Sequence, residues 1–474
     1  MSRYGNLIKN IGFLTVSNFG SRILTFLLIP IYTAVLTTEE YGSFDIIYTT
    51  VSLLLPVLTL GISDGAMRFL LDNKDNKSDI YRITLRVVLT SVVVVALLAG
   101  LNSIFNILPV VKSYWLFFLC HYIVFTLYQV SQDIARGLDK LKNLAISGLV
   151  NSVALLVFNL LFLLVFKWGL NGYFLANIVA NLLATLVIVF STKYYKDINR
   201  REKIDGELRK EMIKYSRPMV LNSVGWWINN VSDRYVILFI LGAAANGVYS
   251  VAYKIPTILS VFQTIFNQAW TVSLIKGYDS EKSRKYVEDV YGVYAVLMLV
   301  LCSATVLFNK TIASFLYFGE FFIAWKYVPL LVFAALFSSL SGLLGAIFGA
   351  EKDSKALSST TMIGTVVNVI LNIIFINLMG VIGAALATAI SSFVVWLSRY
   401  IKCQKYIRFH GANMLRHVFS FLLLGVQVLI CSIFDNTIIY GIQIPILFLI
   451  VFINADIFKS LLTKAREKRS RGEA

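Results

Sequence analysis

Hydrophobic windows of about 20 residues recur along nearly the whole chain, and they constrain its fold more than any other feature. A helix of that length crosses the roughly 30 Å hydrocarbon core of a bilayer. Hydrophobic residues make up 58% of the 474 residues and charged residues only 15%, which leaves too little polar surface for a soluble protein of this size. We therefore predict an all-α polytopic membrane protein.

The basic residues indicate how the chain is oriented in the membrane. The formal net charge is +17, and most Lys and Arg residues gather in alternate connections between the apolar windows, for example 193–217, 399–416 and the tail from Lys459. The positive-inside rule places these connections in the cytoplasm, together with both termini. The charge therefore reports membrane topology, and we expect no nucleic-acid partner.

Spans drawn between these connections give fourteen predicted transmembrane helices. No loop between them is long enough for a folded domain. The predicted ranges are 9–36, 43–71, 80–104, 113–135, 142–166, 170–192, 215–241, 247–275, 286–308, 325–350, 356–378, 381–403, 413–434 and 438–461.

The chain also repeats itself at an offset of about 205 to 213 residues. RGLDKLK (136–142) corresponds to FGAEKDSK (348–355), and FNLLF (158–162) corresponds to LNIIF (371–375). We predict two six-helix lobes, 1–205 and 206–405, related by a pseudo-two-fold axis along the membrane normal. Residues 406–474 add helices 13 and 14 and a basic tail. Transporters built from such repeats place the substrate path between the two halves.

Two further segment pairs share the offset: GLNG (169–172) with GVIG (380–383), and 41–54 with 246–259. The last pair contains two polar rows, each with steps of three and four residues that keep it on one helical face. Such rows either mediate helix packing or line a substrate path. The rows are Asp45, Thr49, Ser52, Pro56, Thr59 and Ser63, and Ser250, Lys254, Thr257, Val261, Thr264 and Gln268.

Five charges stand out within the predicted central helices. Arg22 lies near the middle of the first apolar window, where a cation costs about 2.5–3.5 kcal/mol unless it meets water, a counter-ion or a ligand. Arg22, Arg234 and Lys254 outnumber Asp45 and Asp233. We expect a mildly cationic cavity that can hold an anionic group, and a purely structural ion pair remains the alternative.

Catalytic and metal-binding patterns are absent from the sequence. There is no Gly-x-x-x-x-Gly-Lys-Ser/Thr phosphate loop, the four cysteines are scattered, and the chain has only three histidines. We predict no enzymatic activity, no metal and no cofactor.

Several of these features converge on one family. The N-terminal helix NFGSRILTFLLIPIYTAVL, the loop-helix EEYGSFDII, the RGLDKLK and FGAEKDSK turns, and two six-helix repeats with two terminal helices occur together. The chain resembles the Wzx-type polysaccharide flippases, within the superfamily that includes the lipid II flippases and the MATE drug exporters. The resemblance extends over essentially the full chain.

This resemblance implies a flippase of the bacterial cytoplasmic (inner) membrane. Such a protein moves polyprenyl (undecaprenyl) diphosphate-linked oligosaccharides to the outer leaflet by alternating access, for O-antigen of lipopolysaccharide, exopolysaccharide or another glycan. On this interpretation Arg22, Lys254 and Arg234 contact the diphosphate or acidic sugars. Asn18 and Asn222, which occupy corresponding positions, and Trp226 are further substrate-binding candidates.

The same resemblance leaves the driving force and the partners open. A proton or sodium gradient is one option, with Asp45, Asp64 and Asp233 as candidates for ion coupling or cavity charge. We expect a monomer surrounded by membrane lipids, with glycan polymerases as family-implied partners. Two alternatives stand beside the flippase: a MATE-like cation-coupled drug exporter, which predicts an acidic cavity, and a membrane-embedded glycan polymerase or ligase, which predicts a long charged outer loop.

Overall fold

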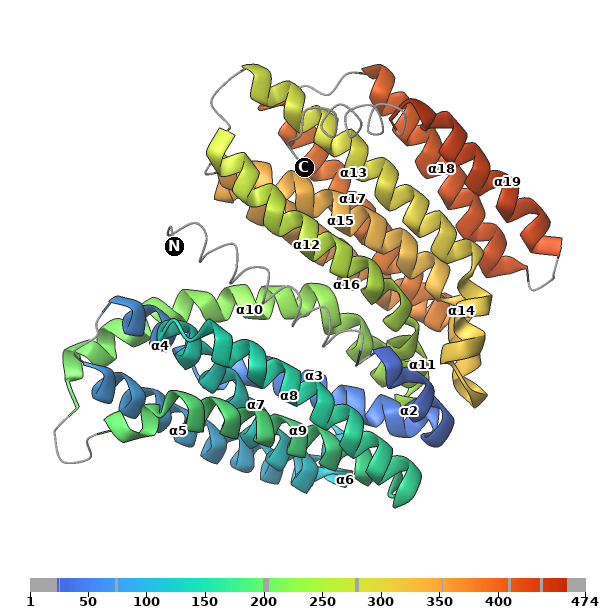
Figure 1. Cartoon of the computed structure of the whole chain (residues 1–474). Coiled ribbons are helices and arrows are strands. Elements are labelled where there is room, and N and C mark those ends of the chain that lie inside the picture. Colours follow the sequence, from blue (N-terminus) through green and yellow to red (C-terminus); the bar gives the residue numbers. More distant parts are fainter. Residues whose placement is uncertain are drawn as a thin grey trace. The chain divides into compact units, whose positions relative to one another are not determined.

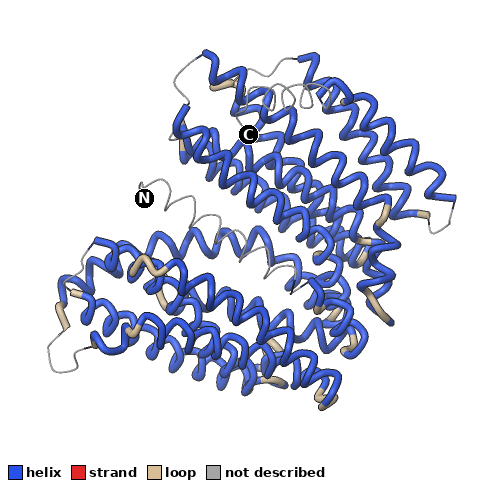
Figure 2. Tube along the Cα trace, viewed as in Figure 1, coloured by secondary structure: helices blue, strands red, loops and turns tan. Residues whose placement is uncertain are grey.

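The computed structural model describes residues 24, 26–72, 76–198, 204–277, 281–351, 353–407, 411–434 and 438–457. Within these ranges every regular element is a helix (Figure 2). Nine helices of the described ranges are long and apolar enough to cross a membrane, and Gly441–Ile453 is a shorter apolar one. The predicted all-α polytopic fold is confirmed.

Contacts divide the chain into two compact units, Met1–Tyr235 and Val236–Ala474. The first unit contains the following elements, whose α-helices are labelled in Figure 1. They are α2 (Ile29–Val35), α3 (Thr38–Leu58), α4 (Ile62–Asp72), α5 (Lys77–Phe105), α6 (Pro109–Ser113), α7 (Trp115–Gly137), α8 (Leu141–Asn159), the π-helix η1 (Leu160–Val165), α9 (Gly169–Thr192), the 3-10 helix η2 (Tyr194–Asp197) and most of α10 (Gly206–Leu241).

The second unit continues from the end of α10. Its elements are α11 (Ala243–Ala252), α12 (Lys254–Gly277), α13 (Glu281–Leu307), α14 (Asn309–Leu316), the 3-10 helix η3 (Gly319–Lys326), α15 (Val328–Ala350), α16 (Ser354–Met379), α17 (Val381–Cys403), α18 (Gly411–Ile433) and α19 (Ile438–Ile453).

The division by contacts falls inside α10, whereas the boundary predicted from the repeat lies at 205/206. The two boundaries describe different things: the repeat counts helices, and the contacts record what α10 packs against. The predicted lobes 1–205 and 206–405 and the appended segment 406–474 stay predictions about the repeat.

Two predicted helices are each interrupted, and proline contributes to both breaks. The predicted helix 43–71 is α3 followed by α4, separated by Leu60 and Gly61 with φ of 53° and 63°. The predicted helix 247–275 is α11 followed by α12. Pro56 and Pro256 lack the N–H that would bond the carbonyl four residues earlier, so the helical hydrogen bonding weakens next to each break.

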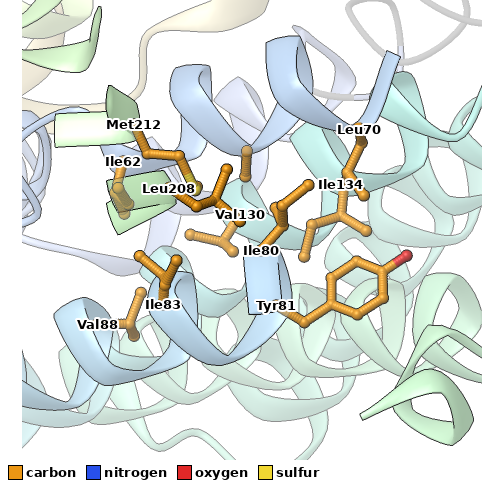
Figure 3. Packing of buried hydrophobic residues seen from close by; sticks show 11 residues of the cluster. Ile62, Leu70, Ile80, Tyr81, Ile83, Val88, Val130, Ile134, Leu208 and Met212 are labelled. Atoms are coloured by element: carbon orange, nitrogen blue, oxygen red, sulfur yellow. The ribbon is translucent and has the colours of Figure 1, made fainter. Parts of the chain in front are cut away.

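The first unit is held together at the basic end of its helices by one apolar cluster (Figure 3). The cluster joins α4, α5, α7 and the first turns of α10, so α10 is anchored to the first unit from its beginning. Its members are Ile62, Ala66, Leu70, Ile80, Tyr81, Ile83, Val88, Val130, Ile134, Leu208 and Met212.

Small residues let α10 approach α4 closely. A Cβ at Gly61 would lie 3.0 Å from the Ser216 carbonyl oxygen, and a Cβ at Gly65 would overlap the Ser216 hydroxyl. The positive φ of Gly61 independently favours glycine there. The α4–α10 contact therefore depends on these two glycines.

In the second unit α15 is the most buried of the nine predicted spans and packs against α12, α13, α16, α17 and α18. Helix α18 docks on α13 through polar side chains. The Ser303 hydroxyl donates to Gln427 Oε1 (2.7 Å), and Gln427 Nε2 donates to the Ser303 carbonyl (3.1 Å). This reciprocal buried pair fixes α18 against α13.

Candidate functional site

A buried ion pair joins α3 to α10 in the first unit. Arg234 Nη1 lies 2.7 Å from Asp45 Oδ1, with the two side chains 18% and 8% exposed. The two residues are 189 positions apart in the chain. At this burial the carboxylate compensates the guanidinium, and removal of either partner leaves the other charge desolvated.

Two further contacts extend this interface. Trp227 Nε1 donates to the Thr49 carbonyl (3.0 Å), and the hydroxyls of Thr50 and Tyr235 are hydrogen-bonded (2.6 Å). The Trp227 and Tyr235 rings also lie 5.2 Å apart. Trp227 therefore uses its indole N–H to hold α10 against α3.

The hydroxyls of the α3 polar row bond within their own helix. Thr49 Oγ1 donates to the Asp45 carbonyl (2.8 Å), Ser52 Oγ to the Thr49 carbonyl (2.7 Å), and Thr59 Oγ1 to the Leu55 carbonyl (2.7 Å). Asp45, Thr49 and Thr59 are buried. In this row the structure supports helix packing rather than a substrate path.

The corresponding row of the second unit is more exposed. Lys254 is partly buried at the start of α12, and its carbonyl accepts the Thr257 hydroxyl (2.6 Å). Thr264 continues the row, and its Oγ1 donates to the carbonyl of the neighbouring Ser260 (2.7 Å). Thr257 and Thr264 are exposed, so their oxygens remain able to accept hydrogen bonds from a ligand.

The remaining predicted residues on α10 differ in exposure. Asn222 is exposed and Trp226 is 66% exposed, while Asp233 is buried and its Oδ1 accepts the Arg234 backbone N–H (3.0 Å). Arg22 and Asn18 lie outside the described residues. The structure thus brings Arg234 together with Asp45, and it does not test the other predicted substrate contacts.

Asp64 belongs to a different cluster, where α4 packs on α7. Arg136 Nη1 lies 2.6 Å from Asp133 Oδ1, and Asp64 interacts electrostatically with the same guanidinium. The Ser63 hydroxyl also bonds the Asp133 carboxylate. Two carboxylates therefore share one arginine at this position. The parts of the chain that the structure describes hold no group of three His, Cys, Asp or Glu side chains suited to a metal ion.

Sequence reasoning missed Arg399, which it counted with the basic connection 399–416. The structure places Arg399 inside α17, with its guanidinium bonded to α15 and α16. A signal was present in the sequence, because the predicted helix 381–403 contains Arg399 and no acidic residue.

Comparison with known proteins assigns this chain to a protein family. The family model described as polysaccharide biosynthesis protein matches residues 7–272, more than half of the 474 residues. The chain belongs to this family. A second model, the lipid II flippase MurJ, matches residues 330–449 in the second unit.

Two relatives of this chain are archaeal. The uncharacterized membrane protein MJ1375 of Methanocaldococcus jannaschii is 24% identical over 415 residues, which cover 83% of this chain and 96% of that protein. The probable low-salt glycan biosynthesis flippase Agl15 of Haloferax volcanii is 22% identical over 240 residues, 47% of this chain and 50% of that protein.

Solved structures support the fold of this polysaccharide biosynthesis family member. The lipid II flippase MurJ in an inward closed conformation superposes with a TM-score of 0.75 at 18% identity, over 95% of this chain and 99% of that chain. An inward-facing multidrug resistance MATE transporter gives a TM-score of 0.66 at 16% identity, over 81% and 95%. At these identities the likeness concerns the fold alone.

These findings confirm the resemblance on which the sequence analysis ended. They support a multi-pass membrane protein that acts as a flippase, and they point to a transporter rather than an enzyme.

Proposed function

We propose that this protein moves a polyprenyl-diphosphate-linked oligosaccharide from the cytoplasmic to the outer leaflet of the cytoplasmic membrane, with both termini in the cytoplasm. The observation that carries the proposal is the match of the polysaccharide biosynthesis family over residues 7–272. The chemistry agrees with it, because a diphosphate cannot cross hydrocarbon without compensating charge. Alternating access of the two repeats is the mechanism that we propose for the movement.

Lys254 and Arg22 are the residues that we propose for contact with the diphosphate. Arg234 is less suited to this role, because Asp45 already neutralises it at 2.7 Å. Lys254 begins the helix whose Thr257 and Thr264 are exposed. Hydroxyl oxygens next to a cation suit a sugar diphosphate, since the ammonium binds the phosphate and the hydroxyls bond the sugar.

Asn222 and Trp226 are proposed to contact the oligosaccharide from α10. Both are exposed, and the indole ring of Trp226 offers a flat apolar face for a sugar ring. Asn18, at the position that corresponds to Asn222, is proposed for the same role. These assignments rest on the proposed function.

Of the three candidates for ion coupling, we propose Asp64 before Asp45 or Asp233. Asp45 is occupied by Arg234, and Asp233 accepts a backbone N–H of its own helix. Asp64 shares Arg136 with Asp133, so a proton or a sodium ion would relieve the repulsion between the two carboxylates.

The test uses the purified protein in liposomes that carry a polyprenyl-diphosphate oligosaccharide labelled on its sugar. The readout is the fraction of label that a membrane-impermeant reagent reaches over time, with and without an imposed proton or sodium gradient. We expect protein-dependent exposure that Lys254→Gln and Arg22→Gln each reduce and that Arg22→Lys partly retains. Loss of exposure in Lys142→Gln, a matched change of an exposed lysine on α8, would contradict the assignment to Lys254 and Arg22.

A second candidate is a MATE-like drug exporter, because a MATE transporter shares this fold. It predicts transport of organic cations and no exposure of lipid-linked sugar. A dye-efflux assay in the same liposomes separates the two, since the proposed flippase is expected to leave a cationic dye in place.

A further inference from the structure

Two cations lie in the seam between α16 and α17, at the end of the helices that carries basic residues. Lys402 Nζ donates to Ser359 Oγ (2.6 Å). Arg399 donates from Nη1 to the Ser341 carbonyl of α15 (2.8 Å) and from Nη2 to Thr361 Oγ1 of α16 (2.9 Å). The guanidinium thus inserts between three helices.

Both cations contact only neutral oxygens among the described residues. Arg399 Nε has Thr360 Oγ1 as its partner at 3.3 Å, and no ion pair with Asp or Glu involves Arg399 or Lys402 in the described ranges. Three of the five guanidinium N–H groups are used in these bonds, which leaves one on each terminal nitrogen. A guanidinium at membrane depth without a carboxylate calls for an anionic partner.

One acidic side chain close to this seam, that of Asp353, is hydrogen-bonded to groups other than these two cations. Asp353, the residue before α16, accepts the Tyr406 hydroxyl (2.7 Å) and the Ala356 N–H (2.9 Å). The Tyr406 hydroxyl, followed by the Ala356 N–H, lowers the pKa of Asp353 below its usual value of 3.8, so this carboxylate is charged at neutral pH. Asp353 also interacts electrostatically with Lys405 and Lys402, but among the described residues no ion pair joins a carboxylate to Arg399 or Lys402.

The equivalent seam of the first unit lies between α8 and α9, and it has no cation at the positions that correspond to Arg399 and Lys402. With the offsets of the repeat, Arg399 corresponds to the fully buried Ile188 and Lys402 corresponds to Ser191. Thr360 corresponds to Ser147, whose hydroxyl donates to the Ala184 carbonyl across the seam (2.8 Å). The helix pair at this place in the first unit therefore packs without cations at these two positions.

Apolar side chains continue from the cations along the outer face of the seam. Met362 and Ile401 are 66% and 61% exposed, and Val366 and Ile370 follow at helical spacing on α16. Only 22% of the apolar window of α16 is buried within the protein. This face is therefore suited to acyl chains, directly beside a pair of cations.

We propose that the α16–α17 seam binds an anionic phospholipid of the cytoplasmic leaflet. Its phosphate contacts Lys402 and the remaining N–H groups of Arg399. The hydroxyls of the exposed Ser358 and the partly buried Thr361 border the headgroup, and the acyl chains lie on Met362 and Val366. Charge complementarity at one end and apolar exposure along the other select a phospholipid over a free anion. The inference is independent of the glycan that the protein moves.

The test is native mass spectrometry of the full-length protein with added phosphatidylglycerol or phosphatidylcholine, read as an apparent Kd for the first bound lipid. We expect phosphatidylglycerol to bind more tightly than phosphatidylcholine. Lys402→Gln and Arg399→Gln are each expected to weaken phosphatidylglycerol about five-fold, the effect of one interfacial cation. Arg399→Lys keeps the charge and is expected to weaken it less.

Lys142→Gln is the matched control, because it removes an exposed lysine from the corresponding end of α8. Equal Kd values for Lys402→Gln, Lys142→Gln and the wild type would overturn the proposal. A competition experiment gives a second way to overturn the proposal. It is overturned if inorganic phosphate or a polyprenyl phosphate displaces phosphatidylglycerol at a lower concentration than a second phospholipid does. If Arg399→Gln fails to fold, the exposed Lys402 decides the outcome alone.

Discussion

The polar rows of α3 and of α11–α12 have the same spacing and occupy corresponding places in the repeat, yet their surroundings differ. In the first unit α10 covers the row: Asp45 pairs with Arg234, and Trp227 bonds the Thr49 carbonyl. In the second unit Thr257 and Thr264 of the row are exposed. Two polar rows with the same spacing thus have different roles: one mediates helix packing and the other forms accessible surface. The helix that lies against the row determines its role.

The largest expected effect is on stability, from breaking the covered row. Asp45→Asn leaves the Arg234 guanidinium buried without its carboxylate, which typically costs about 3–5 kcal/mol. We expect a clearly lower apparent Tm for the protein in nanodiscs. Ser250→Ala, at the corresponding place in α11, removes one neutral hydroxyl and is expected to cost about 1 kcal/mol.

A double replacement sharpens this test. Asp45→Leu combined with Arg234→Met removes both charges, and we expect it to recover most of the stability that Asp45→Asn loses. Equal losses for Asp45→Asn and Ser250→Ala would mean that the ion pair does not hold α10 in place.

The next effect compares two glycines that the repeat places in register. A Cβ on Gly137 would lie 2.9 Å from both the Met67 carbonyl oxygen and the Leu70 Cβ of α4, whereas a Cβ on Gly349 meets nothing within 4 Å. We expect Gly137→Ala to destabilise the protein by about 1–3 kcal/mol through overpacking. Gly349→Ala, near the end of α15, is expected to be neutral or to stabilise by up to about 1 kcal/mol.

Thermal unfolding of the two glycine variants, side by side in the same lipid, measures this difference. A stabilised Gly137→Ala would show that α4 and α7 are not packed as closely as described.

These residues show how much of the structure could be predicted from the sequence. For eight of the nine described spans the hydrophobic windows predicted both ends within a few residues, because burial in lipid demands length and apolarity that the sequence displays directly. The exception is the predicted helix 43–71, whose membrane span ends at Leu58 with α3. The interruptions next to Pro56 and Pro256 were visible in the sequence as missing N–H groups, although the prediction treated each helix as continuous.

The candidate site was harder to predict, because it depends on contacts between distant segments. Asp45 and Arg234 were both singled out, but pairing residues 189 positions apart requires knowing that α10 packs on the first unit. Arg399 was counted with the basic connection 399–416 although the predicted helix 381–403 contains it, and only the packing of α15 and α16 reveals its partners. Arg22 and Asn18 stay predictions.

The smallest expected effect concerns the turns that precede α8 and α16. Asp353 caps α16 through the Ala356 N–H, while the corresponding Lys140 makes no side-chain cap. Because the Tyr406 hydroxyl holds the pKa of Asp353 below 3.8, this contribution is present above that pH and is lost as the pH falls through the lower, folded-state pKa.

Acid unfolding below pH 3.8 measures that contribution. Tyr406→Phe removes the main cause of the shift, so we expect a smaller acid-dependent loss of stability than in the wild type. Tyr195→Phe, which alters an exposed tyrosine of η2, serves as the control and is expected to follow the wild type. An unchanged profile in Tyr406→Phe would contradict the role of this hydrogen bond.

The central claim is that the exposed row of the second unit contacts the transported substrate and that the covered row of the first unit does not. Thiol labelling tests this claim most directly. Thr264→Cys and Thr59→Cys are introduced at corresponding positions in a Cys120→Ala background, because the other three cysteines are buried. Thr59 is fully buried and Thr264 is exposed. The readout is the rate of modification by a small methanethiosulfonate, with and without a polyprenyl-diphosphate oligosaccharide. We predict that Thr264→Cys is modified and that the lipid-linked sugar slows it, while Thr59→Cys stays unmodified. Modification of both positions at one rate, unaffected by the lipid-linked sugar, would contradict the account.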